Sequence, residues 1–447
     1  MNAPSRQSGL QAWIDWLLAL HAQEIDLGIE RVGQVAEKLN INRPAEFVIS
    51  VSGTNGKGSS VAMLSAILKA QGYQVGQYTS PHILRFNERI QIDGQLASDQ
   101  AIVEAFAEIE VARGDIKLTY FEFSTLAALW LFKQAQVDVA VLEVGLGGRL
   151  DAVNLVDADA ALITAIDVDH ADWLGDDRSQ IAIEKAGITR SGKPAICSDP
   201  NPPHSLFAYA QQHQVPLQGL QRDFGFAKTE QAWSVFSLAE PQDTLFCKEL
   251  PFPALKGEFQ LQNAAGVIAL LHAIRERLPV DCGAIKTGLK TAVHPGRLQS
   301  LQIGERAWLI DVAHNPQSAQ ALADYLAEQS ETPQFVSLFS VLNDKDCVPM
   351  IRQIAPWVKE WRIADLQIPR ATDLNTLAAF LVEAGVTKEQ IIGFDSIKAC
   401  VESVKAQDDV SLPVLVWGSF FTVSQVLEAL QSGSDLFTET SRLEQVS

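Results

Sequence analysis

The segment Gly53–Ser60 has the residue types needed to hold the phosphates of a nucleotide. It follows the β-branched run Phe47–Val51 and precedes a helical pattern over Val61–Ala70, which predicts a strand, a glycine-rich loop and a helix. Glycines let backbone N–H groups turn toward an anion, and a helix N-terminus adds partial positive charge. The residues expected to surround the phosphates are Gly53, Thr54, Asn55, Gly56, Lys57, Gly58, Ser59 and Ser60.

The spacing of this loop departs from the common phosphate-binding pattern GxxxxGK[ST]. It is shorter, and Gly58 separates Lys57 from Ser59. Lys57 could reach the β- and γ-phosphates, and a serine hydroxyl could bind phosphate or Mg²⁺. The alternative is an ordinary glycine turn with a solvated lysine, which the flanking strand and helix disfavour. The loop alone leaves a kinase, a GTPase and a ligase open.

Polar side chains follow three further strand-like runs. Glu143 lies at the end of the run 137–144, His170 lies beyond the run 160–166, and Ser80 follows a short stretch that ends at Thr79. Because the carboxyl ends of parallel strands meet at one edge of a sheet, these donors could share one Mg²⁺ with ATP oxygens. A helix cap or ion pair for Glu143, and a packed ring for His170, are the alternatives.

The elements that would position these residues alternate between strands and helices, which predicts an α/β fold. We expect an N-terminal P-loop-type domain over 1–295, with a mostly parallel sheet and helices on both faces. A smaller, Rossmann-like α/β domain is expected over 296–447. Further helices are predicted over 10–39 with a break at Gly28, 124–134 and 260–275, an irregular or antiparallel insertion over 200–255, and C-terminal strands at 308–312, 335–339, 361–364, 391–394 and 414–417.

The composition excludes several classes of protein. The chain has 447 residues, of which 47% are apolar, enough for two or three domains. Its net charge of -19 repels nucleic acid and anionic membranes. No apolar run approaches the length of a membrane span, and the polar N-terminus lacks the apolar region of a signal peptide. The five cysteines include no CxxC, which argues against a disulfide framework or structural zinc and suits the cytoplasm. A monomer is expected.

Several ordered motifs carry a resemblance to a known family. They are GTNGKGS at 53–59, TSPH at 79–82, FNERI at 86–90, LEVGLGGRLDAVN at 142–154, DHADWLG at 169–175, IEKAGI at 183–188, NAA at 263–265, PGR at 295–297 and DVAHNP at 311–316. The chain resembles the folylpolyglutamate synthase family of the Mur ligase superfamily, and most closely its bifunctional bacterial branch. The motifs span most of the chain in family order.

The resemblance implies a set of metal ligands. Ser80, Glu143 and His170 match the family's magnesium ligands. Lys185 matches a lysine that is carbamylated in the family, and a carbamate can bind a second Mg²⁺. The implied cofactors are therefore ATP and two Mg²⁺ ions, with K⁺ as a further candidate. Without the resemblance, Lys185 would be taken for a solvated residue on a helix.

The resemblance also implies where a pterin-bearing substrate binds. It would lie between the N-terminal segment, the SPH–ERI loop and the stretch 119–125. Asp151 could accept hydrogen bonds from the pterin amino group, and the aromatic residues could instead be plain core. Arg85, Arg89 and Arg149 are candidate partners for carboxylates. The substrate residues predicted in this way are Leu27, Arg85, Thr119, Tyr120, Phe121, Glu122, Leu150, Asp151 and Ala152.

The second half of the nucleotide site is implied to come from later motifs. Asn263 would contact adenine, and Arg297 would stabilise phosphate charge. Asp311 would accept from a ribose hydroxyl, with His314 nearby. Asn315 and Pro316 also fit a plain helix start, which does not compete with this role.

Together these residues predict an ATP-dependent ligase that adds L-glutamate to dihydropteroate and to tetrahydrofolate through an acyl phosphate. The residues expected to act in catalysis are Lys57, His170, Lys185 and Arg297. The partners are then small molecules: dihydropteroate, folates, L-glutamate and ATP. The alternatives are a folylpolyglutamate synthase alone, a Mur-type ligase with another carboxylate substrate, a P-loop kinase or GTPase, and a non-catalytic binding protein.

Overall fold

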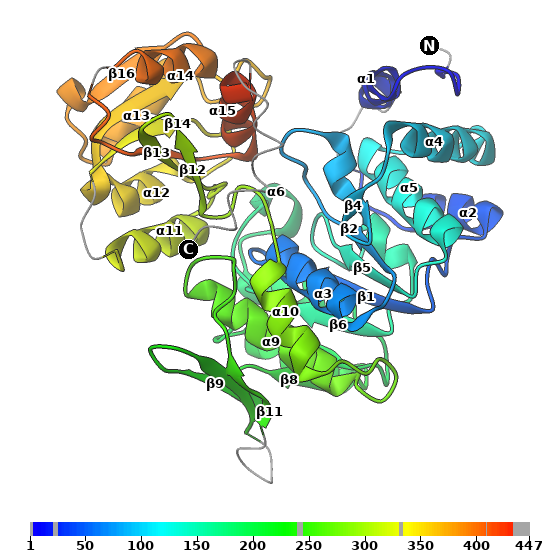
Figure 1. Ribbon diagram of the computed structural model, residues 1–447. Coiled ribbons are helices and arrows are strands. Elements are labelled where there is room, and N and C mark those ends of the chain that lie inside the picture. Colours follow the sequence, from blue (N-terminus) through cyan, green and yellow to red (C-terminus); the bar gives the residue numbers. More distant parts are fainter. Residues whose placement is uncertain (1–2, 21–25, 239–244, 330–333, 408, 432–447) are drawn as a thin grey trace. The chain divides into compact units, whose positions relative to one another are not determined.

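The computed structural model describes residues 3–20, 26–238, 245–329, 334–407 and 409–431 (Figure 1). The chain forms two compact units, each with its own sheet. The first comprises Met1–Leu255 and Phe259–His294, and the second comprises Lys256–Glu258 and Pro295–Ser447. The mixed α/β class predicted from the sequence is confirmed in both units.

The described part of the first unit is built on an eight-stranded sheet with the order β4-β3-β2-β5-β1-β6-β7-β8. Its strands are β1 Phe47–Ser52, β2 Val75–Tyr78, β3 Ile90–Ile92, β4 Gln95–Leu96, β5 Val139–Glu143, β6 Ala160–Ile163, β7 Ala195–Cys197 and β8 Leu217–Gly219. Along the series β2-β5-β1-β6-β7-β8 each strand is parallel to its neighbours, whereas β3 and β4 are antiparallel and extend the sheet beyond β2. The carboxyl ends of the central strands β5, β1 and β6 therefore lie side by side.

Helices cover both faces of this sheet, because successive side chains of β1 enter two different cores. Val48 packs into one core, whereas Ile49 and Val51 pack into the other. The first core is closed by α1 Leu10–Leu20, α2 Glu30–Leu39, α4 Asp99–Arg113 and α5 Tyr120–Ala135. The second is closed by α3 Lys57–Gln71, α9 Phe259–Ala273 and α10 Cys282–Thr291. The remaining helices of this unit are η1 Phe86–Arg89, η2 Ala152–Leu155, α6 Ala171–Leu174, α7 Arg178–Ala186 and α8 His204–Gln212.

The predicted insertion over 200–255 divides into two different parts. Residues 204–219 continue the α/β alternation, since α8 leads into β8, which joins the main sheet. The antiparallel expectation holds for the rest: β9 Phe224–Lys228, β10 Trp233–Ser237 and β11 Leu245–Leu250 form a separate sheet. The fully buried Trp233 and Val235 anchor this small sheet to the second core.

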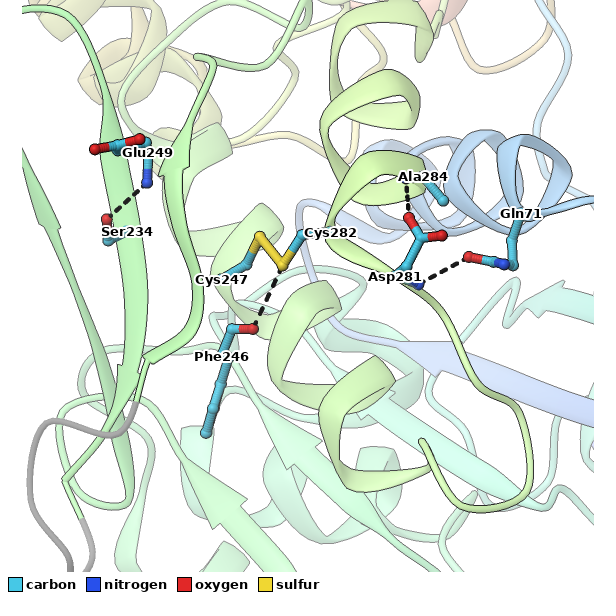
Figure 2. The surroundings of a disulfide bond; sticks show 8 residues. All are labelled: Gln71, Ser234, Phe246, Cys247, Glu249, Asp281, Cys282 and Ala284. Atoms are coloured by element: carbon cyan, nitrogen blue, oxygen red, sulfur yellow. Dashed lines mark hydrogen bonds between the residues drawn. A yellow bond between two sulfur atoms is a disulfide. The ribbon is translucent and has the colours of Figure 1, made fainter.

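The cysteine number and spacing argue against a disulfide framework, but the structure contains one disulfide. Cys247 of β11 is bonded to Cys282, the first residue of α10 (Figure 2). The two Cα atoms lie 6.0 Å apart although 35 residues separate the cysteines in sequence, so spacing alone gives no sign of the pair. The backbone N–H of Asp281 donates to Gln71 at the end of α3, 2.8 Å away. The bond thus links the small sheet to a helix that packs on α3. Cys197, Cys347 and Cys400 are free and buried.

The described part of the second unit has a six-stranded sheet with the order β12-β13-β17-β14-β15-β16. Its strands are β12 Gln299–Ile303, β13 Arg306–Ile310, β14 Phe335–Phe339, β15 Val358–Ala364, β16 Ile391–Phe394 and β17 Val414–Trp417. Its helices are α11 Pro316–Ala327, α12 Cys347–Ile354, η3 Ala355–Trp357, α13 Leu374–Glu383, η4 Lys388–Gln390, α14 Ile397–Lys405 and α15 Phe420–Gln431. All pairs are parallel except β12 with β13. Across the described residues, no helix combines the length and apolar character that a membrane span requires.

Candidate active site

The phosphate loop runs from the end of β1 directly into α3, which begins at Lys57, earlier than the predicted start at Val61. Gly56 caps the helix in the left-handed region, with φ of 91°. A side chain there would be strained, and its Cβ would lie 2.5 Å from Oδ1 of Asn263. A Cβ at Gly53 would collide with Thr164, and one at Gly58 with His294. Close neighbours therefore explain all three glycines of the loop.

The loop is fixed to the segment that follows β6. The backbone N–H of Thr54 donates to the carbonyl of Ala165 over 2.7 Å, and the Thr54 hydroxyl donates to the carbonyl of Asp167 over 2.8 Å. The Thr164 hydroxyl donates to the carbonyl of Asn55 over 2.7 Å. The backbone of the loop is thus rigidly held before any anion binds, which reduces the ordering cost of binding.

Lys57 folds back over its own loop. Its Nζ donates to the carbonyls of Gly53 and Thr54, at 3.1 and 3.2 Å. Lys57 also acts electrostatically on two buried groups, since its charge lowers the pKa of both Lys185 and Asp151. The structure therefore brings together the phosphate loop, the predicted carbamylation site and a predicted substrate residue.

The predicted metal ligands Ser80 and Glu143 meet at the ends of neighbouring strands. β2 pairs in parallel with β5, and the backbone N–H of Ser80 donates to Oε2 of Glu143 over 3.1 Å. The Glu143 side chain is buried. The buried Glu143 carboxylate and the Ser80 hydroxyl are oxygen donors of the kind that Mg²⁺ prefers.

His170 lies on the segment after β6, where it caps the short helix α6 with a left-handed φ of 53°. Its backbone N–H donates to Oδ1 of Asp169 over 2.8 Å. Within the described ranges, no three or more His, Cys, Asp or Glu side chains form a metal-binding group. The predicted metal ligands do not form a group of this kind, because two of the four are a serine and a lysine.

Lys185 is buried in α7, with only 3% of the residue exposed. Burial and, to a smaller extent, the charge of Lys57 lower the pKa of Lys185 to about 7, and Asp169 opposes the shift. A large fraction of the amine is thus neutral near pH 7, and only a neutral amine reacts with CO₂ to give a carbamate. This environment fits the carbamylation implied by the resemblance, and a carbamate would add oxygen donors to the site.

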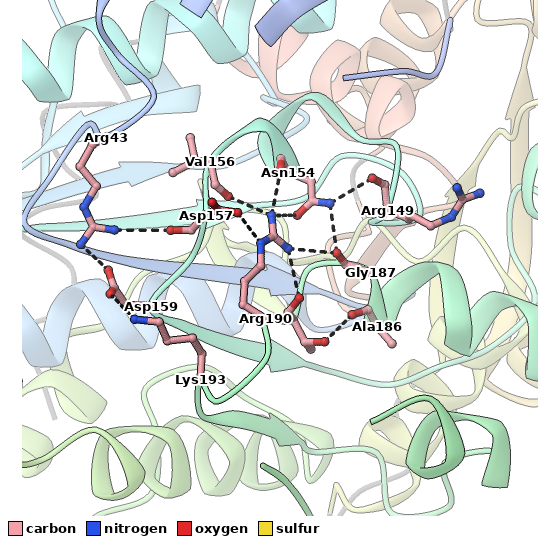
Figure 3. A network of polar contacts seen from close by, with 11 residues as sticks. Arg43, Arg149, Asn154, Val156, Asp157, Asp159, Ala186, Gly187, Arg190 and Lys193 are labelled. Atoms are coloured by element: carbon pink, nitrogen blue, oxygen red, sulfur yellow. Dashed lines mark hydrogen bonds and ion pairs between the residues drawn. The ribbon is translucent and has the colours of Figure 1, made fainter. Parts of the chain in front are cut away.

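The turn after β5 docks tightly on the helix that carries Lys185. A Cβ on Gly148 would lie 2.6 Å from the Glu184 carbonyl. The Asn154 amide donates to the carbonyls of Arg149 and Gly187, and Arg190 donates to the Asn154 amide oxygen over 3.0 Å (Figure 3). The residues 148–154 and the end of α7 therefore behave as one packed unit.

Three predicted substrate segments lie together around Arg31. The Arg31 guanidinium pairs with Glu122 at 2.9 Å and with Asp26 at 2.7 Å. The backbone N–H of Gly28, next to Leu27, donates to the carbonyl of Leu150 over 3.1 Å. The N-terminal segment, the start of α5 and the residues 150–152 are thus adjacent, as the predicted pterin site requires.

Aromatic side chains at the start of α5 extend this group. A Cβ on Gly145 would lie 2.5 Å from the Phe121 ring, so Phe121 packs against the turn after β5. Arg89 lies over the Tyr120 ring, 5.3 Å from its centroid, and donates to Nδ1 of His82 over 2.7 Å. Burial, with the Arg89 charge, lowers the pKa of His82 to about 3, so this ring is a neutral acceptor.

The predicted arginines differ in their surroundings. Arg89 is buried in the aromatic group, whereas Arg85 is exposed at the start of η1. Arg149 is half exposed and forms an ion pair with Glu184 at 2.7 Å. Of the three, Arg89 is therefore the arginine that the fold places among the substrate residues.

Asp151 is nearly inaccessible and caps η2. Its carboxylate accepts backbone N–H groups from Leu146 at 2.8 Å and Val153 at 2.9 Å. Burial raises its pKa to about 6, although these N–H groups and Lys57 favour the charged form. Gly145 donates a third backbone N–H, which leaves one of the four lone-pair sites of the carboxylate for a pterin amino group. Thr119 and Ala152 are buried beside these elements, and Thr119 caps α5.

Helix α9 supplies the next group of polar residues beside the loop. Asn263 packs against Gly56, as noted above, and its Nδ2 donates to Oε1 of Gln260 over 3.0 Å. Nε2 of Gln260 donates to Oγ of Ser59 over 3.1 Å. The predicted adenine contact and the phosphate loop are therefore joined by a side chain that the sequence analysis did not single out.

The predicted residues of the second unit gather at the end of β13. Asp311 is buried and accepts the backbone N–H groups of Leu298 and Ala313, at 2.9 and 2.8 Å. Burial raises the pKa of Asp311, and the nearby charge of Arg297 opposes that shift. Arg297 lies over the Phe420 ring at 5.1 Å, and His314 lies 5.7 Å from the same ring. A cation, an acid and an imidazole thus share one small area.

Sequence reasoning did not single out several residues of the first unit that contact predicted site residues. Among them are Arg31, His82, Thr164, Gln260 and His294. Each contacts a predicted site residue only because the fold brings a distant element, or the other side of a loop, next to it. The glycines were the one available signal, because a glycine in a tight loop indicates a close neighbour without identifying it.

Comparison with known families matches both units of the chain. Residues 51–271 match the Mur ligase middle domain, and residues 296–420 match the Mur ligase glutamate ligase domain. The two matches together cover most of the sequence.

Individual proteins give the same result. The dihydrofolate synthase/folylpolyglutamate synthase of Escherichia coli (strain K12) is 41% identical over 438 residues, which cover 96% of this chain and 98% of the relative. A solved structure of E. coli FolC in complex with DHPP and ADP has a TM-score of 0.88 at 40% identity, covering 96% of this chain and 100% of the other. A bifunctional folylpolyglutamate synthase/dihydrofolate synthase with Mn, AMPPNP and L-glutamate bound has a TM-score of 0.86 at 41% identity, with the same coverage.

Proposed function

The chain belongs to the dihydrofolate synthase/folylpolyglutamate synthase family of Mur ligases, and on that premise we propose that it joins L-glutamate to dihydropteroate and to tetrahydrofolate. The enzyme is an ATP-dependent, ADP-forming ligase. The products are dihydrofolate in the first reaction and a folylpolyglutamate in the second, and both activities belong to folate biosynthesis.

One structural observation carries this proposal. The rigid loop Gly53–Ser59 carries Lys57, whose charge acts on the buried Lys185, and the pKa of Lys185 is lowered to about 7. A kinase or GTPase needs the loop and a metal, but it has no need of a buried, largely neutral lysine. The groups predicted to bind a pterin adjoin the same region through Asp151, whose pKa responds to Lys57.

The first chemical step activates the carboxylate. A carboxylate oxygen of the pteroate or folate attacks the γ-phosphorus of ATP, the bond from that phosphorus to the β–γ bridging oxygen breaks, and ADP leaves. Lys57, whose Nζ contacts the loop carbonyls of Gly53 and Thr54, would turn toward the transferring group and neutralise its charge. We assign the same role to Arg297.

The second step forms the amide bond. The α-amino group of L-glutamate attacks the carbonyl carbon of the acyl phosphate and loses a proton, and the bond from carbon to the phosphate oxygen breaks to release inorganic phosphate. The chain contributes by holding the acyl phosphate away from water, since hydrolysis would waste ATP. No side chain is modified covalently by substrate in either step.

Solved relatives contain ATP analogues and a divalent metal, so this chain is assigned ATP and a divalent metal ion. We propose two Mg²⁺ ions, with K⁺ as a further candidate. Ser80, Glu143 and His170 would hold the first, and carbamylated Lys185 the second. When bound, such ions draw charge from the phosphate oxygens. The hydrogen bond that joins Ser80 to the buried Glu143 supports this donor set.

The remaining assignments follow from the same proposal. Residues 1–295 would form the ATP-binding domain of the Mur ligase central type, and 296–447 the C-terminal ligase domain. Asn263, Asp311 and His314 would contact the nucleotide, and residues 119–122 and 150–152 the pterin. The partners are small molecules, without nucleic acid or membrane, and the protein would act as a cytoplasmic monomer.

A glutamate incorporation assay tests the proposed function. The purified chain is incubated with ATP, Mg²⁺, labelled L-glutamate and either dihydropteroate or tetrahydrofolate. We expect label in both products and release of one phosphate for each glutamate added. Incorporation with tetrahydrofolate alone would reduce the activity to folylpolyglutamate synthase. Absence of incorporation with both substrates would contradict the proposal and leave a Mur-type ligase with another carboxylate substrate as the next candidate.

A further inference from the structure

Resting on the function proposed above, we propose that Gln260 is a positioning residue that couples nucleobase recognition at Asn263 to the phosphate loop at Ser59. Gln260 belongs to α9, whereas Ser59 belongs to the first turn of α3, and 201 residues separate the two in sequence. No substrate contact is assigned to Gln260 itself. Its effect passes through its two neighbours.

The three side chains form a short buried chain of hydrogen bonds. Nδ2 of Asn263 donates to Oε1 of Gln260 over 3.0 Å, and Nε2 of Gln260 donates to Oγ of Ser59 over 3.1 Å. The exposed fractions are 0% for Gln260, 2% for Ser59 and 5% for Asn263. Buried polar groups depend on such partners, because an unmatched one loses its hydration without compensation.

The direction of these bonds fixes what Ser59 can offer. A hydroxyl has one hydrogen to donate and two lone pairs. Because Gln260 occupies one lone pair, the hydrogen and the second lone pair remain for a phosphate oxygen or a metal ion. The neighbouring Ser60 hydroxyl is fully buried and has no hydrogen-bond partner within the described residues. The network therefore orients Ser59 and not Ser60.

The same amide also fixes Asn263. The Asn263 side chain touches Gly56, where a Cβ would lie 2.5 Å from its Oδ1, so little space remains for another rotamer. Gln260 accepts one N–H of that amide and so determines which way the amide oxygen and nitrogen point. An amide in fixed orientation can distinguish adenine from guanine, because the two bases exchange donors and acceptors at the six-membered ring.

Nucleotide binding to the intact chain tests this role. Gln260→Met removes both hydrogen bonds at similar volume. We expect ADP affinity in Mg²⁺, measured by calorimetry, to fall about tenfold, and the preference for ADP over GDP to shrink. The variant Gln262→Met on the same helix is the control and should keep both values. KM for ATP should rise, while KM for glutamate and for the pteroate should stay unchanged.

A double-mutant cycle separates positioning from general damage. If Gln260 acts through Ser59, the double variant Ser59→Ala/Gln260→Met should lose ADP affinity by a smaller factor than the product of the two single-variant factors. The proposal would be overturned if the two factors of lost ADP affinity simply multiply in the double variant, or if folded Gln260→Met keeps its ADP affinity. If Gln260→Met does not fold, Gln260→Glu replaces it, since an ionised carboxylate still accepts from Asn263 but cannot donate to Ser59. Weaker ADP binding then supports the proposal, and unchanged binding overturns it. The ADP result stands even if ligation is never detected.

Discussion

Replacing Lys57 with alanine is expected to lower kcat/KM for ATP by on the order of 10³-fold, the upper range for loss of one charged or donor group that stabilises a transition state. The expectation follows from the position of Lys57, whose Nζ lies over the carbonyls of Gly53 and Thr54 in the phosphate loop. Charge on the transferring phosphoryl group grows during the reaction, so most of the loss should appear in kcat and less in KM.

The measurement is phosphate release dependent on L-glutamate, with ATP varied. Lys69→Ala is the matched control, because Lys69 lies in the last turn of the same helix and is exposed. It should keep normal turnover. Near-normal activity of Lys57→Ala, with an unchanged melting temperature, would mean that the phosphates bind elsewhere.

The second large effect concerns Lys185. Because of this residue, turnover by the enzyme should depend on both pH and CO₂. Burial lowers the pKa of Lys185 to about 7. Below that pH the side chain is an ammonium ion, which neither reacts with CO₂ nor binds a metal. As the pH rises through about 7 the neutral amine appears, and carbamate formation releases one proton. Activity should therefore rise with pH over this range. Added bicarbonate should move the rise to lower pH by drawing the amine into carbamate.

Three observations test this expectation. The full chain kept under ¹³C-labelled CO₂ should show a carbamate signal by NMR, and Lys185→Arg should remove both that signal and turnover. Lys398→Ala, an exposed residue of α14, is the control and should change neither. A pH profile that is indifferent to CO₂, together with an unmodified and fully active Lys185, would contradict the carbamate.

Much of the fold could be predicted because short β-branched runs and glycine turns are local signals. The strands 335–339, 391–394 and 414–417 begin and end where the sequence indicated. The helix after the phosphate loop begins at Lys57 and not at Val61, because the glycines that seemed to end the loop also start the helix. Residues 204–219 looked irregular because β8 is short and only one of its three residues is buried.

The site residues named from the sequence remain proposals, and the fold adds what sequence could not supply. Ser80 and Glu143 become neighbours only through the pairing of β2 with β5. Arg31 joins Asp26 to Glu122 across a long separation in sequence. The bond between Cys247 and Cys282 also depends on tertiary packing, so the odd cysteine count and wide spacing gave no sign of it. Local patterns carry no information on such distant pairs.

The most direct test of an acyl-phosphate ligase follows one oxygen atom. Dihydropteroate labelled with ¹⁸O in its carboxylate is incubated with the protein, ATP, Mg²⁺ and L-glutamate, and the released phosphate is analysed by mass spectrometry. Transfer of the carboxylate oxygen through an acyl phosphate predicts one ¹⁸O atom in each phosphate released with a new amide bond. Phosphate without ¹⁸O, at normal rates of amide formation, would contradict activation of the carboxylate by phosphoryl transfer.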